Sequence, residues 1–222
     1  MKIPGSLVKQ IILKGMPLLI NETLWSAGQA ILIQCYSMRG LTAVAAVNIS
    51  STMLNLLNTV VMAMGNSIAI IVGNQLGANK MNEAKDTVRK LIFTSVSACI
   101  VIGAIFFAVS PLIPRLYNTT DDVKALATVF LKINAAMVPI MAISNCCYFT
   151  LRSGGKTLLT FIFDSAFVWC ICLPPAFITA YFTSLGVITI YVIIQSLECV
   201  KALYGLILVK KGIWLNNIVA KA

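Results

Sequence analysis

The chain of 222 residues is 59% hydrophobic and only 11% charged, and it contains no histidine. Soluble domains carry about 25% charged residues, so this composition excludes an ordinary soluble domain and favours a membrane protein. The net charge of +10 comes from lysines and arginines that separate long apolar runs without interleaved aromatic residues, a distribution that argues against nucleic-acid binding.

Six apolar segments are long enough to cross the roughly 30 Å hydrocarbon core of a bilayer. They lie at residues 13–38, 41–76, 88–113, 123–151, 158–183 and 186–209. They predict an all-α integral membrane protein in which residues 1–222 form a single six-helix bundle in contact with membrane lipid. The lysines of residues 1–14 alternate with apolar residues, which suits a lead-in segment at the membrane surface.

The first span carries a polar face. Helical spacing aligns the following residues: Glu22, Ser26, Gln29, Ile33 and Tyr36. Glu22 is about 13 Å from the start of the span at about 1.5 Å per residue, which places it near the middle of the membrane. A carboxylate at that depth must be protonated, ion-bound or paired, so Glu22 is a candidate functional residue.

The second span carries a row of amides on one helical face, formed by Asn48, Asn55, Asn58 and Asn66. A lipid-facing helix does not carry such a row, because each unsatisfied amide in hydrocarbon is costly. The row is therefore expected to face other helices as packing contacts, or to line a watery cavity. Both interpretations stay open at this stage.

Prolines punctuate the third and fourth spans. Pro111 and Pro114 are expected to end the third, and Pro139 is expected to kink the fourth. The polar face of the fourth span consists of Asn134, Met141, Asn145, Tyr148 and Arg152.

The last two spans contain three more charged residues. Asp164 lies about six residues into the fifth span, so it is expected to be shallower than Glu22 and could simply brace the turn at residues 154–155. Glu198 and Lys201 in the sixth span are spaced i,i+3 and are expected to form an intrahelical ion pair. Beyond that span, Trp214 is expected at the membrane interface.

Basic residues are unequally divided between the two sides that six spans would create. One side, which also holds both termini, receives Lys2, Lys9, Lys14, Lys80, Lys85, Arg89, Lys90, Arg152, Lys156, Lys210, Lys211 and Lys221. The other side receives Arg39, Arg115 and Lys124. Because positive residues mark the cytoplasmic side, both termini are expected in the cytoplasm and the protein in the plasma membrane.

Several kinds of chemistry are not expected. The seven cysteines lie in apolar runs without a CxxC pair, so they are interpreted as small hydrophobic residues rather than disulfides or metal ligands. Without histidine there is no nucleophile–histidine pair. Residues 154–157 end like a phosphate-binding loop but lack its first glycine and follow no strand. We therefore expect neither an enzyme nor an organic cofactor nor a metal centre.

A combination of short motifs resembles a known family. The matching residues are Pro17, Asn21–Trp25, Gly73–Ala78, Glu83–Ala84, Leu151–Thr157, Asp164, Trp169, Pro174, Glu198, Lys201 and Trp214. In this order they resemble the C-terminal half of a MATE-family multidrug and toxin extrusion transporter of the DinF-like type. The resemblance covers essentially the whole chain.

The resemblance implies a transporter of two six-helix lobes that exports organic cations in exchange for Na⁺ or H⁺ by alternating access. This chain would be the lobe of helices seven to twelve, completed by an N-terminal lobe or a second copy. The residues expected to couple ion movement are Glu22, Glu198, Lys201 and Asp164. The residues expected to line the substrate cavity are Trp25, Gln29, Tyr36, Asn48, Asn55, Asn58, Asn134 and Asn145.

One departure from the family pattern concerns the fourth span. Some relatives bind a cation there through an aspartate, whereas this span has only the amides Asn134 and Asn145, which leaves Glu22 as the main acid. Two other functions remain as alternatives. A related flippase for lipid-linked saccharides would need an arginine-rich cavity, and these spans contain almost no arginine. A membrane scaffold that transports nothing would fit the chain length, because one lobe cannot enclose a two-lobed pathway.

Overall fold

The computed structural model of the chain describes residues 5–216, with side chains from residue 15 onward except that of residue 157. The lysines predicted in the lead-in segment lie outside the described side chains, and Lys221 lies outside the described residues.

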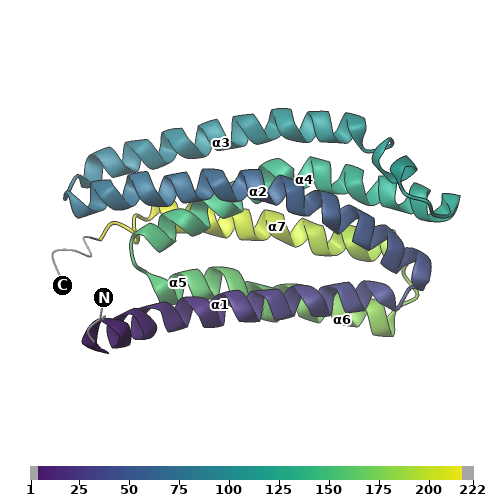
Figure 1. The fold of residues 1–222 in the computed structure, drawn as a ribbon, viewed down its shortest axis with the longest axis horizontal. Coiled ribbons are helices and arrows are strands. Elements are labelled where there is room, and N and C mark those ends of the chain that lie inside the picture. The colour runs from purple at the N-terminus through teal and green to yellow at the C-terminus, as the bar shows by residue number, and fades with distance from the viewer. Residues whose placement is uncertain (1–4, 217–222) are drawn as a thin grey trace.

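Six antiparallel rods make up the fold (Figure 1). Five of them are single helices: α1 (Gly5–Ser37), α2 (Leu41–Gly77), α3 (Met81–Val109), α4 (Asp121–Ser153) and α7 (Val187–Lys210). The remaining rod is composite: α5 (Thr157–Phe161), the π-helices η2 (Ile162–Ala166) and η3 (Val168–Cys172), and α6 (Leu173–Phe182). A short 3₁₀ helix, η1 (Ile113–Leu116), lies between α3 and α4.

Five of these rods are long and apolar enough to cross a membrane: α2, α3, α4, the composite rod from Leu158 to Phe182, and α7. This confirms a multi-pass helical membrane protein. The first predicted span, 13–38, overlaps α1 except for its last residue. Helix α1 is not among the five in the described part of the chain, so that sixth span stays a prediction.

Helix α3 begins seven residues earlier than the predicted span. The basic segment after residue 80 is already helical, and it buries Ala84 and Val88 against the bundle. At the other end α3 stops at Val109, just before Pro111, and Pro114 is incorporated in η1.

Helix α4 continues through Pro139. A proline cannot donate to the carbonyl four residues earlier. That carbonyl, of Ala135, lies so close to Gly103 of α3 that a Cβ at Gly103 would be 2.8 Å from it.

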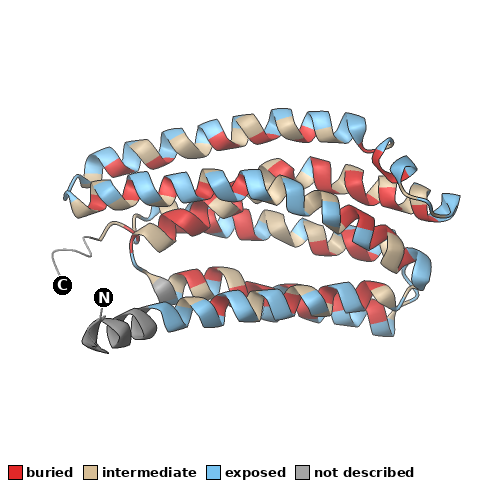
Figure 2. Cartoon of the chain, viewed as in Figure 1, coloured by how far each residue is buried: buried red, intermediate tan, exposed pale blue. Residues whose placement is uncertain are grey.

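The rods form two layers (Figure 1). Helix α4 packs against α2, α3 and α7 in one layer, while α1 pairs with the composite rod in the other. Buried residues concentrate on α4 and on the surfaces facing it, and the outer face of α3 is largely exposed (Figure 2). At the end near the α1–α2 turn, a cluster around Phe130 and Tyr191 joins the layers and includes Leu32, Cys35 and Tyr36 of α1.

A second cluster lies at the opposite end and corrects one prediction. Trp214, expected at the membrane interface, is 1% exposed and packs with residues such as Leu76 and Leu151. Its Nε1 atom donates a hydrogen bond to the carbonyl of Val209 at 3.0 Å. The reason is a turn after α7, where Gly212 has φ 69° and lets the chain fold back over the end of the bundle.

The two ends of the bundle differ in charge. The end with the α2–α3 turn, the α4–α5 turn and the segment after α7 carries the basic residues Lys80, Lys85, Arg89, Lys90, Arg152, Lys156, Lys210 and Lys211. The other end carries Arg39, Arg115 and Lys124. The helical arrangement therefore keeps apart the two groups of cations that the sequence separates.

Candidate functional site

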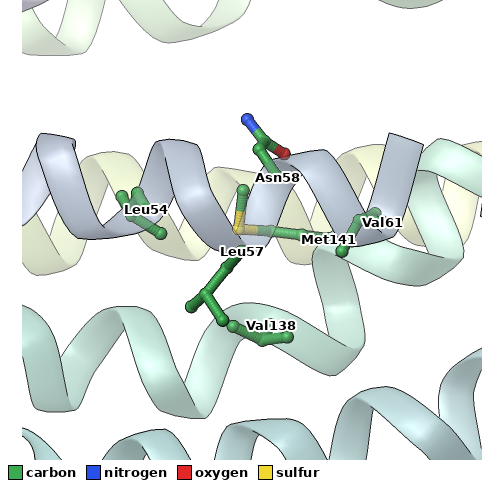
Figure 3. Close-up of a pocket in the computed structure, with 6 residues that line it drawn as sticks. All are labelled: Leu54, Leu57, Asn58, Val61, Val138 and Met141. Atoms are coloured by element: carbon green, nitrogen blue, oxygen red, sulfur yellow. The ribbon is translucent and has the colours of Figure 1, made fainter. Parts of the chain in front are cut away.

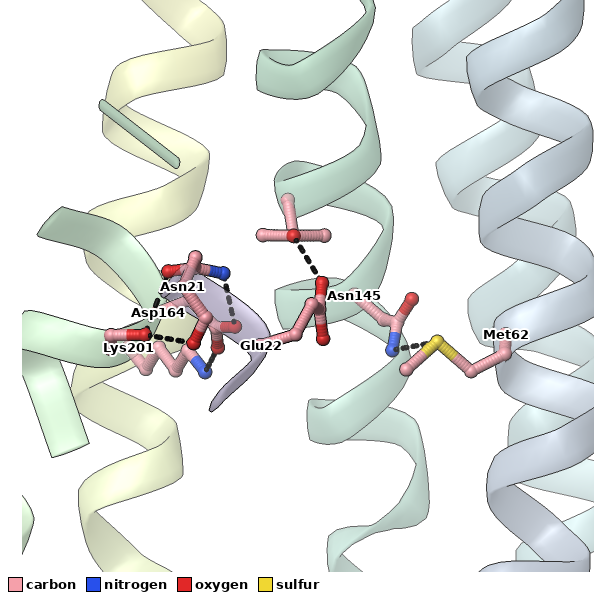
Figure 4. Close-up of polar contacts among 8 residues, drawn as sticks. Asn21, Glu22, Met62, Asn145, Asp164 and Lys201 are labelled. Carbon is pink, nitrogen blue, oxygen red and sulfur yellow. Dashed lines mark hydrogen bonds and ion pairs between the residues drawn. The ribbon is translucent and has the colours of Figure 1, made fainter. Parts of the chain in front are cut away.

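Glu22 lies on an exposed face of α1 and contacts α4. One of its carboxylate oxygens accepts a hydrogen bond from the Tyr148 hydroxyl at 3.2 Å (Figure 4). Tyr148 itself is 7% exposed and packs edge-on against Phe149, so the α4 core fixes the ring that holds Glu22. Among the described side chains, this tyrosine is the hydrogen-bond partner of Glu22.

Asn145 precedes Tyr148 by one turn on the same face of α4. Its amide nitrogen lies 3.8 Å from the Met62 sulfur of α2, and its Oδ1 atom is buried without a hydrogen-bond donor (Figure 4). Helix α2 can approach this closely because residue 65 is glycine: a Cβ there would be 2.7 Å from that oxygen. A carboxylate, a hydroxyl and an unsatisfied amide oxygen thus lie on neighbouring parts of α1 and α4.

Lys201 pairs with Asp164, which corrects the predicted Glu198–Lys201 pair. The Nζ atom of Lys201 lies 2.9 Å from Oδ1 of Asp164 (Figure 4). Glu198 is half-buried and within electrostatic range of Lys201, but no ion pair among the described side chains includes it. The i,i+3 rule considers only one helix, and here Lys201 lies against the neighbouring π-helix η2, which carries Asp164.

Asp164 also reaches α1, at the same level as Glu22 rather than at the shallower depth predicted. Asn21 donates through Nδ2 to Asp164 Oδ2 at 3.4 Å. The Ser165 hydroxyl makes 2.7 Å contacts with both the backbone carbonyl and the side-chain oxygen of Asn21. One turn further, Trp169 donates to the Leu24 carbonyl at 3.0 Å. Asp164 therefore does not brace the turn at residues 154–155; it joins α1 to α7.

The composite rod owes this role to its irregular helix. Two π-helical stretches in sequence widen the turns that face α1. Such π-helical turns are rare and often occur at functional sites. A glycine on α1 permits the close approach, since a Cβ at Gly28 would lie 2.6 Å from the Val168 side chain. Sequence reasoning named Asn21 only as part of the family motif, missed Ser165, and placed Tyr148 on a polar face without finding its partner.

Of the eight predicted cavity residues, two are exposed, four are half-buried and two are buried. Asn48 and Asn55 of α2 are exposed, and Asn58 is half-buried. On α1, Trp25 and Gln29 are half-buried. A pocket beside Asn58, formed by side chains of α2 and α4, has a volume of about 10 Å³ (Figure 3). Sites for drug-sized ligands measure several hundred Å³, so this pocket holds at most a water molecule.

Two predicted cavity residues belong to the core instead. Asn134 is 0% exposed: it donates to the Ser50 hydroxyl and accepts from Tyr191 and Gln195, each at 2.7 Å. Tyr36 is 5% exposed, with its ring 5.3 Å from that of Tyr191. Both side chains therefore join helices and do not line an open cavity. Asn134 illustrates the packing interpretation of a membrane amide, because all its partners are other side chains of the bundle.

The seven cysteines are free thiols, and most are buried. Among the described residues, no group of three or more His, Cys, Asp or Glu side chains is placed to hold a metal ion.

A family model, MatE, matches residues 17–178. The chain belongs to the MatE family. The matched region runs from α1 into α6, so it includes Glu22, Tyr148 and Asp164.

Three curated relatives support the same family. The chain is 21% identical over 192 residues to the probable multidrug resistance protein YoeA of Bacillus subtilis, which covers 86% of this chain and 42% of the relative. It is 26% identical over 180 residues to the probable multidrug resistance protein YpnP of the same organism, with 80% and 40% covered. It is 25% identical over 172 residues to the probable multidrug resistance protein NorM of Oceanobacillus iheyensis, with 77% and 37% covered. This MatE-family chain thus spans about two fifths of the length of the relatives it matches.

Proposed function

We propose that this chain is one lobe of a multidrug efflux antiporter that exports organic cations in exchange for Na⁺ or H⁺. The names of the relatives support multidrug efflux, because all three are called probable multidrug resistance proteins. The coverage supports the assignment as a lobe, since 86%, 80% and 77% of this chain align with only 42%, 40% and 37% of the three relatives. Alternating access then requires a second lobe, supplied by another chain or a second copy.

The observation that carries this proposal is the environment of Glu22. Its carboxylate lies on the exposed face of α1 and accepts a hydrogen bond from the Tyr148 hydroxyl, and Asn145, one turn before Tyr148 on α4, has an unsatisfied side-chain oxygen. Within a membrane such a carboxylate is costly unless a proton or an ion neutralises it. Oxygen ligands suit a proton or a hard cation such as Na⁺. Glu22 would therefore exchange its proton or Na⁺ in step with substrate.

The substrate path would follow the open polar surface of the same helices. Asn55 and Asn58 of α2 offer hydrogen bonds, and Gln29 of α1 extends this polar surface. Trp25 is half-buried on α1 and offers an aromatic face to an organic cation. A facing lobe would enclose this surface and so complete the cavity.

The proposal includes an orientation in the plasma membrane of a bacterium. The basic end of the bundle would face the cytoplasm, in accordance with the positive-inside rule. Both termini would then be cytoplasmic.

The test is Glu22→Gln, which preserves shape and removes the exchangeable charge. The transporter that contains this chain is reconstituted in liposomes, and export of an organic cation is driven by an imposed Na⁺ or pH gradient. Glu22→Gln should abolish gradient-driven export while leaving assembly intact. The control is Glu83→Gln, which makes the same substitution in the exposed Lys80–Glu83 ion pair. Normal gradient-driven export by Glu22→Gln would refute the assignment of Glu22 as the coupling residue.

A further inference from the structure

The Asp164–Lys201 ion pair touches the turn of α1 that carries Glu22. Asp164 uses both carboxylate oxygens: Oδ1 accepts from Lys201 of α7 at 2.9 Å, and Oδ2 accepts from Asn21 of α1 at 3.4 Å (Figure 4). Asn21 is 2% exposed, whereas the next residue, Glu22, is exposed and bonded to α4. A single turn of α1 is therefore held on one side by the ion pair and presents Glu22 on the other.

The pair is buried. The side chains of Lys201 and Asp164 are only 9% and 14% exposed. The Lys201 ammonium also lies 5.5 Å from the ring of Phe163 and 5.9 Å from that of Phe167. Apolar residues of similar volume often stabilise a protein as well as or better than a buried ion pair. Stability alone is thus a weak reason for two charges here, and a positional role is the better explanation.

The half of α1 that leads into Asn21 has few other attachments. Met16, Leu19 and Ile20 are 47%, 67% and 47% exposed, and no residue from 15 to 20 is buried. The far half of α1 is anchored by Leu32 and its neighbours in the core cluster. In the described part of the near half, the buried contacts begin at Asn21.

We propose that Asp164 and Lys201 are positioning residues that hold the near half of α1, and with it Glu22, against α4 and α7. The coupling step requires Glu22 to meet Tyr148 in a fixed geometry. The ion pair provides that geometry through Asn21, while Ser165 fixes the amide of Asn21. This inference deepens the proposed function and rests on it for its effect on transport, but not for its effect on the position of α1.

The test measures position and transport separately. Spin labels are placed on two exposed sites, Leu19 of α1 and Phe93 of α3, in the full chain reconstituted in lipid. The distance distribution between the labels is recorded by double electron–electron resonance. The variants are Lys201→Met, Asp164→Asn and the double variant Asp164→Asn/Lys201→Met. The conservative variant is Lys201→Arg, and the matched control is Lys80→Met, which breaks the exposed Lys80–Glu83 pair.

Each single variant should broaden the distance distribution and reduce ion-driven export by about tenfold, as loss of a residue that orients a ligand often does. Lys201→Arg should retain most of both properties, and Lys80→Met should change neither. The double variant leaves no unpaired buried charge, so its thermal stability should recover while the broad distribution and weak export remain. If the pair were purely structural, the double variant would instead recover its thermal stability, its narrow distance distribution and its export.

Two outcomes would overturn the inference: an unchanged distance distribution in Lys201→Met, or narrow distances and normal export in the stable double variant. Failure of the proposed function would look different. If Glu22→Gln exports normally while Lys201→Met still broadens the distribution, Glu22 is not the coupling residue but the pair still positions α1.

Discussion

The Tyr148 hydroxyl lies 3.2 Å from Oε1 of Glu22, although the two residues are 126 positions apart. This contact crosses from one layer of the bundle to the other, and its tyrosine ring is fixed within the core of α4. Tyr148 therefore links Glu22 directly to the four-helix layer.

Tyr148→Phe should weaken ion-driven export by about tenfold or more, because a hydrogen bond to a charged group contributes about 1.5–3 kcal/mol. The ring and its packing remain, so the unfolding temperature should change little. The measurement is export by the reconstituted transporter under an imposed gradient. Tyr181→Phe, an exposed tyrosine on α6, is the control. Equal export by both variants would show that the Tyr148 hydroxyl has no part in coupling.

The two kinds of amide should respond differently to alanine. Asn134→Ala should lower the free energy of unfolding by about 3 kcal/mol, because it leaves the buried Ser50 and Tyr191 and the half-buried Gln195 without their shared partner. Asn66→Ala removes an exposed amide of α2 and should change stability by less than about 0.5 kcal/mol. A denaturant titration of each variant in detergent measures its free energy of unfolding. Equal stability of the two variants would contradict the core role of Asn134.

Gly154 should tolerate no side chain. A Cβ there would overlap the backbone carbonyl of Trp214, which belongs to the segment that folds back over the end of the bundle. Gly154→Ala should therefore destabilise the chain by about 1–3 kcal/mol, the range expected for overpacking. Gly73→Ala on α2 is the matched control, since nothing lies within 4 Å of the added carbon. That control should be neutral or stabilising, because alanine favours a helix by up to about 1 kcal/mol. A thermal melt in which Gly154→Ala equals the parent chain would refute the tight contact.

Much of the fold was predictable because hydropathy and helix-breaking residues act locally. The second span was predicted at 41–76 and α2 occupies Leu41–Gly77; the sixth was predicted at 186–209 and α7 occupies Val187–Lys210. The early start of α3 was missed because its first turns are polar and basic, which hydropathy excludes although they are helical.

The site was predictable only in part, because its contacts join distant segments. Glu22 and Asp164 were identified as charges within spans, but spacing rules could pair Lys201 only with Glu198 on its own helix. The true partner, Asp164, is 37 residues away, and it lies in a π-helical segment that contacts α1 through Ser165 and Trp169. Burial separates Asn134 from Asn55 in the same way: both are amides within a span, and only the packing of α4 against its neighbours distinguishes them.

The orientation of the bundle can be tested by labelling single cysteines in intact cells. Asn118 and Asn82 are exposed at opposite ends, the first next to η1 and the second at the start of α3. If the basic end is cytoplasmic, Asn118→Cys should react with an impermeant maleimide and Asn82→Cys should react only after the cells are opened. The parent chain measures any reaction of its own exposed Cys170. The reverse pattern would invert the proposed topology.

The last prediction is that the chain needs a second lobe. Helix α2 exposes the amides Asn48, Asn55 and Asn66, and hydrocarbon cannot satisfy them. A facing lobe would supply hydrogen-bond partners or enclose water, and either one removes the cost of exposing amides to lipid. Expressed by itself, the chain should confer no resistance to organic cations, whereas co-expression with a matching N-terminal lobe should restore it. Native mass spectrometry of the purified protein identifies the assembly in each case. Resistance conferred by a verified monomer would contradict the two-lobe proposal, and a complete complex that still exports nothing would favour a scaffold role instead.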